Sequence, residues 1–203
     1  MLFRSDLHLR QTRERIVGQR PPSSPFVIFL GRLAPKKGLQ TLLEAFSRLV
    51  LDFPRLHLVI AGPDPFGLAP ALQKQASKSG FGNRVTYLGI VTEPFKYALL
   101  AAAEALVLPS ESEGFSMSVL EALACRTPVV VSEGCHLPIV ESSGAGFVVR
   151  LDPDSVSNAL RRIVGDTTTL SVMRNRARRL VEARFSDAFV AKAFEKVYLD
   201  ASR

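Results

Sequence analysis

The sequence has few of the residues that characterise several common classes of protein. It has no tryptophan, two cysteines and three histidines among 203 residues. Cys125 and Cys135 are too few for a disulfide framework, and their spacing relative to His136 matches no zinc-binding pattern. No serine or cysteine nucleophile motif accompanies a histidine. We therefore expect reduced thiols, no metal site, no cofactor and no histidine-based catalytic set.

Long apolar runs are also missing. No stretch approaches the roughly 20 apolar residues that span a bilayer, and no signal-peptide pattern is present. These absences predict a soluble, cytoplasmic protein. The hydrophobic content of 47% is nevertheless sufficient to bury a full core in a chain of this length.

The formal net charge is +7, and arginines crowd the C-terminal third. Such a run most often forms a solvated helix face. Nucleic-acid binding is disfavoured because the sequence has no interleaved aromatic series, no RNP-like run and no zinc-finger spacing. Weak attraction to an anionic membrane surface remains as the functional alternative.

The chain divides into two parts by composition. Residues 1–25 are polar and basic and close in a Pro/Ser-rich stretch, which predicts a linker or N-terminal extension. Residues 26–203 alternate short apolar runs with amphipathic segments. The apolar runs predict six buried strands: FVIFLG, LHLVIAG, RVTYLG, ALVLP, PVVVS and GFVV.

Helical patterns fill the intervals between these runs. They cover about 39–51, 68–79, 94–102 and 116–125, and three more follow at 153–164, 168–184 and 186–201. Strand and helix alternation predicts an α/β fold, a Rossmann-like three-layer domain with a six-stranded, mainly parallel sheet and C-terminal helices. Ligands of such domains bind outside the carboxyl ends of the strands.

The stretch 109–131, PSESEGFSMSVLEALACRTPVVV, joins one predicted strand to a helix. It carries two carboxylates, Glu113 in the turn and Glu121 in the helix, with seven residues between them. The amides of Phe115, Ser116 and Met117 are expected at the helix N-terminus, where unpaired N–H groups and the dipole favour an anion. An anion-binding site flanked by two hydrogen-bond acceptors for hydroxyl groups suits a sugar nucleotide, because such a molecule has a diphosphate between two polyols.

Each carboxylate also has a purely structural explanation. Ser118 and Glu121 fit the capping box Ser-x-x-Glu, in which the acid binds the backbone amide of the N-cap. Glu113, like Glu111, could be a solvated loop acid.

A second candidate is the turn GRLAPKKGLQ after the first predicted strand, with Arg32, Lys36 and Lys37 before a helix. It matches neither the dinucleotide fingerprint nor the P-loop. Cations beside a helix N-terminus oppose the helix dipole, so a bound anion would relieve the repulsion. The alternative is an exposed loop with solvated side chains.

Together these stretches resemble a known family. EGFSMSVLE, followed by ALA and TPVVV, resembles the Glu, seven residues, Glu motif of the retaining glycosyltransferases of family four, or group one, which have the GT-B fold. The turn with Arg32 and Lys37 is similar to the diphosphate-binding turn of that family. AGPDP at Gly62 resembles its AG turn, and the segment near Ile90 resembles the place where it holds the nucleotide base.

The resemblance implies a function and site roles. Arg32, Lys37 and the amides near Ser116 would stabilise the departing diphosphate, and Glu121 would bind the ribose. Glu113 is the implied catalytic residue, which holds the transferred sugar. The implied reaction is metal-independent, retaining transfer of a hexose-type sugar from a UDP-sugar or GDP-sugar to a glycan or lipid-linked acceptor, at the inner face of the membrane. The alternative is an isolated nucleotide-sugar-binding or scaffold module without transfer activity, because the chain covers only the C-terminal, donor-binding half of a GT-B fold.

Some positions depart from the family pattern. Ser116 and Arg126 stand where the family has glycine, and Ile139 stands where it often has glutamate. The last helix resembles the closing helix of the family, which packs on the N-terminal half. Its apolar positions Phe189, Phe194, Val197 and Tyr198 predict self-association or packing on that missing half.

Overall fold

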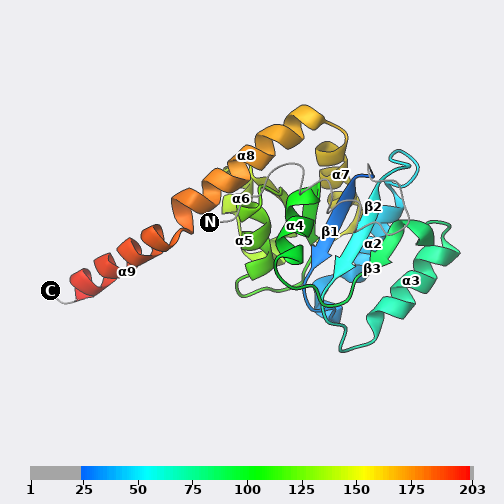
Figure 1. Cartoon of the computed structure of the whole chain (residues 1–203), viewed down its shortest axis with the longest axis horizontal. Helices are drawn as coiled ribbons and strands as arrows, with labels where there is room; N and C mark the ends of the chain where they lie inside the picture. Colours follow the sequence, from blue (N-terminus) through cyan, green and yellow to red (C-terminus); the bar gives the residue numbers. More distant parts are fainter. Residues whose placement is uncertain (1–23, 202–203) are drawn as a thin grey trace.

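The computed structural model describes residues 24–201, and the structural statements below concern this range (Figure 1). Most of the predicted linker, residues 1–23, and His8 within it lie outside the described residues.

All six predicted strands are present in one sheet, in which every adjacent pair is parallel. The order is β3-β2-β1-β4-β5-β6, which is the doubly wound Rossmann order. The central strands are fully buried, whereas the edge strands β3 and β6 are only partly buried, which corrects the expectation of six buried strands. The strands are β1 (Phe26–Leu30), β2 (His57–Ala61), β3 (Val85–Tyr87), β4 (Ala105–Leu108), β5 (Val129–Ser132) and β6 (Gly146–Val149).

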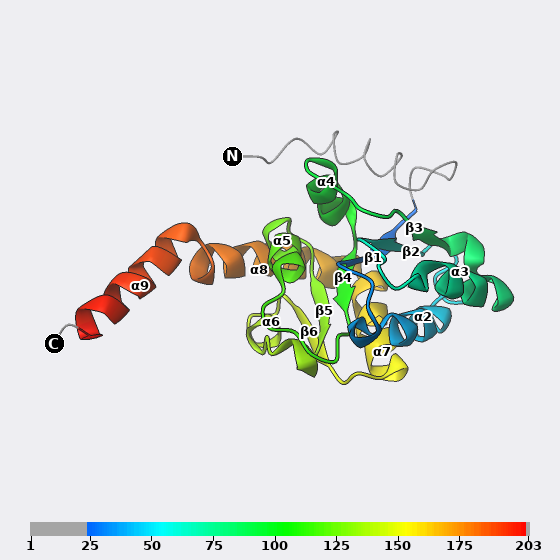
Figure 2. The ribbon, with the colours of Figure 1, turned by 90° about the horizontal axis from the view of Figure 1, so that it is seen from below.

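Helices cover both faces of this sheet. Helices α2, α3 and α7 pack together on one side, and α4, α5 and α8 pack together on the other (Figure 2). The α-helices are α2 (Leu39–Ser47), α3 (Leu68–Lys78), α4 (Phe95–Ala102), α5 (Met117–Ala124), α6 (Ile139–Ser142), α7 (Pro153–Val164), α8 (Thr167–Arg184) and α9 (Asp187–Ala201). The short 3₁₀ helices are η1 (Pro35–Lys37), η2 (Gly82–Arg84) and η3 (Glu133–Cys135).

Two helices differ from the prediction. Helix α6 was not predicted, because four residues are too few to show a helical period. Helix α2 ends at Ser47 rather than near residue 51. Beyond its end, Arg161 donates to the carbonyl of Arg48 (3.3 Å) and Arg84 donates to the carbonyl of Val50 (2.6 Å). These side chains satisfy backbone carbonyls beyond the end of the helix that have no helical partner.

The candidate site lies at the centre of the sheet. Strand β1 lies between β2 and β4, and the helices that follow β1 and β4 cover opposite faces. The loops after these two strands therefore diverge at a topological switch point, where open α/β sheets bind their ligands. They are residues 31–38 and 109–116.

Gly38 allows these two loops to touch. Its φ is 64°, in the left-handed region, and a Cβ atom added there would lie 1.8 Å from the carbonyl oxygen of Pro109. No side chain fits in that space, so glycine is required at this position for two independent reasons.

The last helix leaves the body of the domain. Figures 1 and 2 show α9 running away from the sheet beyond α8. Its apolar positions are exposed, with Phe194 at 60%, Val197 at 64% and Tyr198 at 71%. Within residues 24–201, no helix combines the length and the apolarity that a bilayer span requires.

Candidate functional site

The two loops at the switch point are held together by backbone and hydroxyl contacts. The carbonyl of Lys36 accepts hydrogen bonds from Ser110 Oγ (3.0 Å) and from the amide of Glu111 (2.8 Å). On the other side, the amide of Glu113 donates to the carbonyl of Gly134 (2.9 Å). The backbone that carries Glu113 is therefore fixed by the loops after β1 and β5.

Across this junction, Lys37 and Glu113 form an ion pair through Lys37 Nζ and Glu113 Oε1. The side chains are 15% and 10% exposed, so Glu113 is not the solvated loop acid of the structural alternative. Burial favours the neutral Glu113 carboxyl. The hydrogen bonds from Lys37 and Ser110, with the charge of Lys37, outweigh burial and lower the pKa of Glu113. The site thus holds an ionised carboxylate and an ammonium group close together.

The N-terminus of α5 lies directly after this carboxylate. Its N-cap is Ser116, which is buried and makes no side-chain capping bond. Helix α7, in contrast, is capped by Asp152, which accepts from the amide of Ser155 (2.7 Å). The first turn of α5 has no acidic residue either. Its free N–H groups and the positive end of the helix dipole therefore favour a bound anion.

Glu121, one turn further along α5, has a different partner. Its Oε1 atom lies 2.7 Å from Nζ of Lys96 on α4. The capping-box alternative is wrong, because the N-cap is Ser116 and Ser118 lies inside the helix. Glu121 is therefore free of a capping role and is about one fifth exposed.

No hydrogen bond or ion pair within residues 24–201 joins the predicted residues Gly62, Ile90 and Arg32 to Glu113 or Glu121. Gly62 follows β2 with φ 138°, and a Cβ there would meet the carbonyl oxygen of Gly31 at 1.9 Å. Ile90 follows β3 and is 71% exposed. Arg32 is exposed and has no ion-pair partner among residues 24–201. The contacts thus pair two predicted residues, Lys37 and Glu113, with each other, whereas Glu121 pairs with Lys96, which was not predicted.

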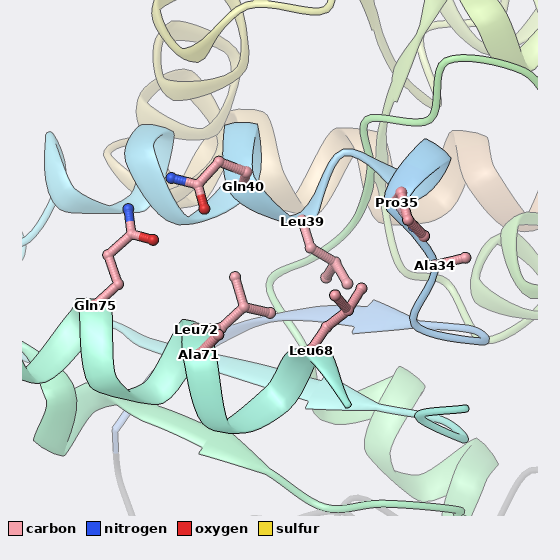
Figure 3. Close-up of a pocket in the computed structure, with 8 residues that line it drawn as sticks. All are labelled: Ala34, Pro35, Leu39, Gln40, Leu68, Ala71, Leu72 and Gln75. Atoms are coloured by element: carbon pink, nitrogen blue, oxygen red, sulfur yellow. The ribbon is translucent and has the colours of Figure 1, made fainter. Parts of the chain in front are cut away.

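A separate cavity of about 180 Å³ lies between α2 and α3 (Figure 3). It is mainly apolar and adjoins the loop after β1, with Gln40 and Gln75 at its polar end. None of the predicted site residues lines it. The lining residues are Ala34, Pro35, Leu39, Gln40, Leu68, Ala71, Leu72 and Gln75.

Comparison with known protein families identifies the family of this chain. The model of the family described as glycosyl transferases group 1 matches residues 10–180. The chain belongs to the group 1 glycosyl transferases. The family resemblance that the Glu113 and Glu121 motif predicts is confirmed.

Curated relatives of this group 1 chain are longer than it is. The D-inositol 3-phosphate glycosyltransferase of Streptomyces bingchenggensis is 32% identical over 192 residues, which are 90% of this chain and 42% of that protein. The alpha-D-kanosaminyltransferase of Streptomyces kanamyceticus is 29% identical over 165 residues, 80% of this chain and 42% of that protein. The chain spans less than half the length of these relatives.

Solved structures define the fold of this part of a group 1 transferase. The C-terminal domain of the group 1 family protein LpcC from Francisella tularensis superposes with a TM-score of 0.80 at 18% identity. The match covers 91% of this chain and 96% of that domain. HepE from Anabaena, solved with UDP-glucose, gives a TM-score of 0.83 at 22% identity and covers 97% of this chain and 54% of HepE. The predicted fold, a Rossmann-like C-terminal half of GT-B, is confirmed.

Two residues of this group 1 site were missed by the sequence analysis. Ser110 is fully buried and ties the loop after β4 to Lys36, and Lys96 binds Glu121. A small hydroxyl after a strand and one lysine on an amphipathic helix carry no local signal. Only the strand order, which places α4 beside α5, brings Lys96 to Glu121.

The thiols of the chain are free. Burial, then the charge of Glu121, raises the pKa of Cys125 to about 11, and burial raises the pKa of Cys135. Thiols with raised pKa values are poor nucleophiles at neutral pH. Among the described residues, no group of three or more His, Cys, Asp or Glu side chains is arranged to hold a metal ion.

Proposed function

We propose that the chain is the donor-binding half of a retaining glycosyltransferase, which transfers a hexose-type sugar from a UDP-sugar or GDP-sugar. The observation that carries this proposal is the part-buried Lys37–Glu113 pair at the switch point, beside the uncapped N-terminus of α5. The site offers positive charge to a phosphate and an ionised carboxylate to a hydroxyl group. Membership of the group 1 family, and the likeness to HepE, which was solved with UDP-glucose, support the same class of ligand.

The diphosphate is proposed to sit against the N-terminus of α5. Lys37 and Arg32 supply full charges, and the backbone N–H groups of residues 115–117 supply hydrogen bonds. As the bond to the sugar breaks, negative charge grows on the departing phosphate. Preorganised donors aimed at that charge lower the barrier, so no metal ion is needed in this role.

The two carboxylates are proposed to hold the two polyol ends of the donor. Glu113, fixed by the Gly134 carbonyl and Lys37, accepts hydrogen bonds from hydroxyl groups of the transferred sugar and orients its anomeric carbon. Glu121 accepts from the ribose hydroxyl groups. Attack from the face that the phosphate leaves retains the anomeric configuration. Gly62 and the main chain near Ile90 border the nucleotide in this arrangement.

The acceptor, a glycan or a lipid-linked sugar, is assigned to a second half. The chain spans 42% of the curated relatives named above, so transfer is proposed for the complete assembly rather than for this domain alone. The exposed face of α9 is proposed to pack on that half, and weak contact of the arginine-rich helices with an anionic membrane is proposed to bring the enzyme near its acceptor.

Calorimetric titration of the purified chain tests this function. We expect one of UDP, GDP, ADP or their sugar conjugates to bind, and Glu121→Ala to weaken binding about tenfold or more, because hydrogen bonds to a charged acceptor are lost. Glu141→Ala, which removes an exposed carboxylate on α6, is the matched control and should bind as the wild type does.

Three outcomes would count against the proposal. Absence of binding at millimolar nucleotide contradicts a donor site in this chain. Binding that is unchanged by Glu121→Ala contradicts the assigned ribose contact. A nucleotide-sugar that binds well but is never transferred when the acceptor half is supplied would favour the binding-module alternative.

A further inference from the structure

Lys96 lies where two parts of the proposed nucleoside site meet. Its Nζ atom is 2.7 Å from Oε1 of Glu121 and 3.4 Å from Oε1 of Glu93. The same ammonium group lies 4.7 Å from the ring centroid of Tyr97, whose hydroxyl donates to Glu93 (2.6 Å). Lys96 is thus held by a carboxylate on each side and by an aromatic face.

These contacts join segments that are distant in the chain. Glu93 ends the loop that follows β3, the loop that carries Ile90, and Glu121 lies on α5. Lys96 is the second residue of α4 and is 19% exposed. Because an ammonium group has three donors, one lysine can bind both carboxylates at once. It also separates two negative charges that would otherwise repel each other.

The contact on Glu121 leaves that carboxylate able to bind a ligand. Lys96 binds Oε1, and Oε2 of Glu121 has no hydrogen bond to any residue in the described range. A carboxylate has about four acceptor sites on its two oxygens. An unanchored glutamate samples several rotamers, and anchoring one oxygen restricts where the other points.

We propose that Lys96 is a positioning residue, which holds the Glu121 carboxylate in the orientation that accepts the ribose hydroxyl groups of the nucleoside diphosphate. This inference rests on the proposed function, because it takes the ribose contact of Glu121 as given. Lys96 acts through Glu121 and does not itself touch the ligand. Its removal should therefore weaken the part of the affinity that depends on the ribose hydroxyl groups and leave the rest.

The test compares UDP and GDP with their 2′,3′-dideoxy analogues by calorimetric titration. For the wild type, loss of the two hydroxyl groups should weaken binding about tenfold or more. In Lys96→Met, this ratio should fall to about one or two, while affinity for the dideoxy analogue stays near the wild-type value. Lys96→Arg, which keeps the charge and the donors, should restore most of the ratio.

A control variant and the contradicting results distinguish a failure of the proposed Lys96 role from a failure of the proposed function. Lys74→Met, which removes an exposed lysine on α3, should keep the wild-type ratio. If the wild type discriminates and Lys96→Met discriminates equally, or loses affinity for both ligands by one factor, the positioning role is overturned and the donor site stands. If the wild type binds neither UDP nor GDP, or binds without discrimination, the proposed ribose contact fails and this inference falls with it.

Discussion

Replacing Lys37 by methionine is expected to weaken nucleoside diphosphate binding about a hundredfold, the largest effect of any single charge in the site. The substitution removes a charged donor to the phosphate and leaves the Glu113 carboxylate, 10% exposed, without its counter-ion. An unpaired carboxylate beside the diphosphate adds repulsion to the lost attraction. Calorimetric titration of the variant with the nucleotide that the wild type binds measures this loss.

Lys36→Met provides a matched control for Lys37→Met. Lys36 is the adjacent lysine and carries the same charge, but its side chain is exposed and has no ion-pair partner within the described range. Its removal should weaken binding only severalfold, through the long-range charge. Because loss of the part-buried pair also costs about 1–3 kcal/mol of stability, both variants need thermal unfolding curves beside the titrations. Equal losses of affinity in the two variants would show that Lys37 acts only through net charge.

Replacing Gly38 by alanine is expected to lower the free energy of unfolding by about 3–5 kcal/mol, near the upper limit of single substitutions. The new Cβ would lie 1.8 Å from the Pro109 carbonyl oxygen, so the loops after β1 and β4 must move apart. That movement separates Lys37 from Glu113 and should abolish nucleotide binding even where the domain still folds. Urea unfolding followed by circular dichroism measures the stability.

Gly67→Ala isolates the effect of the close approach at Gly38. Gly67 has φ 66°, nearly the same as the 64° of Gly38, and a Cβ there would have no heavy atom within 4 Å. The left-handed backbone alone should cost about 1 kcal/mol. A Gly38→Ala variant no less stable than Gly67→Ala would mean that the two loops are not in the tight contact described above.

Much of the fold could be predicted because its strands are short apolar runs in a regular alternation. All six strands lie where those runs are, and α3, α5, α7 and α8 agree with their predicted bounds to within a residue. Parallel strands place their carboxyl ends at one edge, so Lys37 and Glu113 could be expected on the same side of the sheet although 76 positions separate them. The structure confirms that they meet.

What could not be predicted depends on neighbours that only the folded chain provides. Arg126, which stands where the family has glycine, has a φ of 62°, a left-handed conformation that glycine adopts most easily and that was not predicted. The capping-box interpretation of Ser118 and Glu121 failed because the helix begins two residues earlier than that motif requires. The Lys96–Glu121 pair depends on the packing of α4 against α5, which no local pattern encodes.

The most direct test of a donor site at the switch point is to map where the nucleotide binds. Backbone amide shifts of the ¹⁵N-labelled chain, titrated with the nucleotide that calorimetry selects, report this residue by residue. We expect the largest changes in residues 32–38 and 113–117, with smaller ones near Lys96 and Glu121. Changes confined to the residues of α2 and α3 that line the cavity, with Arg32, Lys37 and residues 113–117 unaffected, would contradict the assignment and place the ligand site elsewhere.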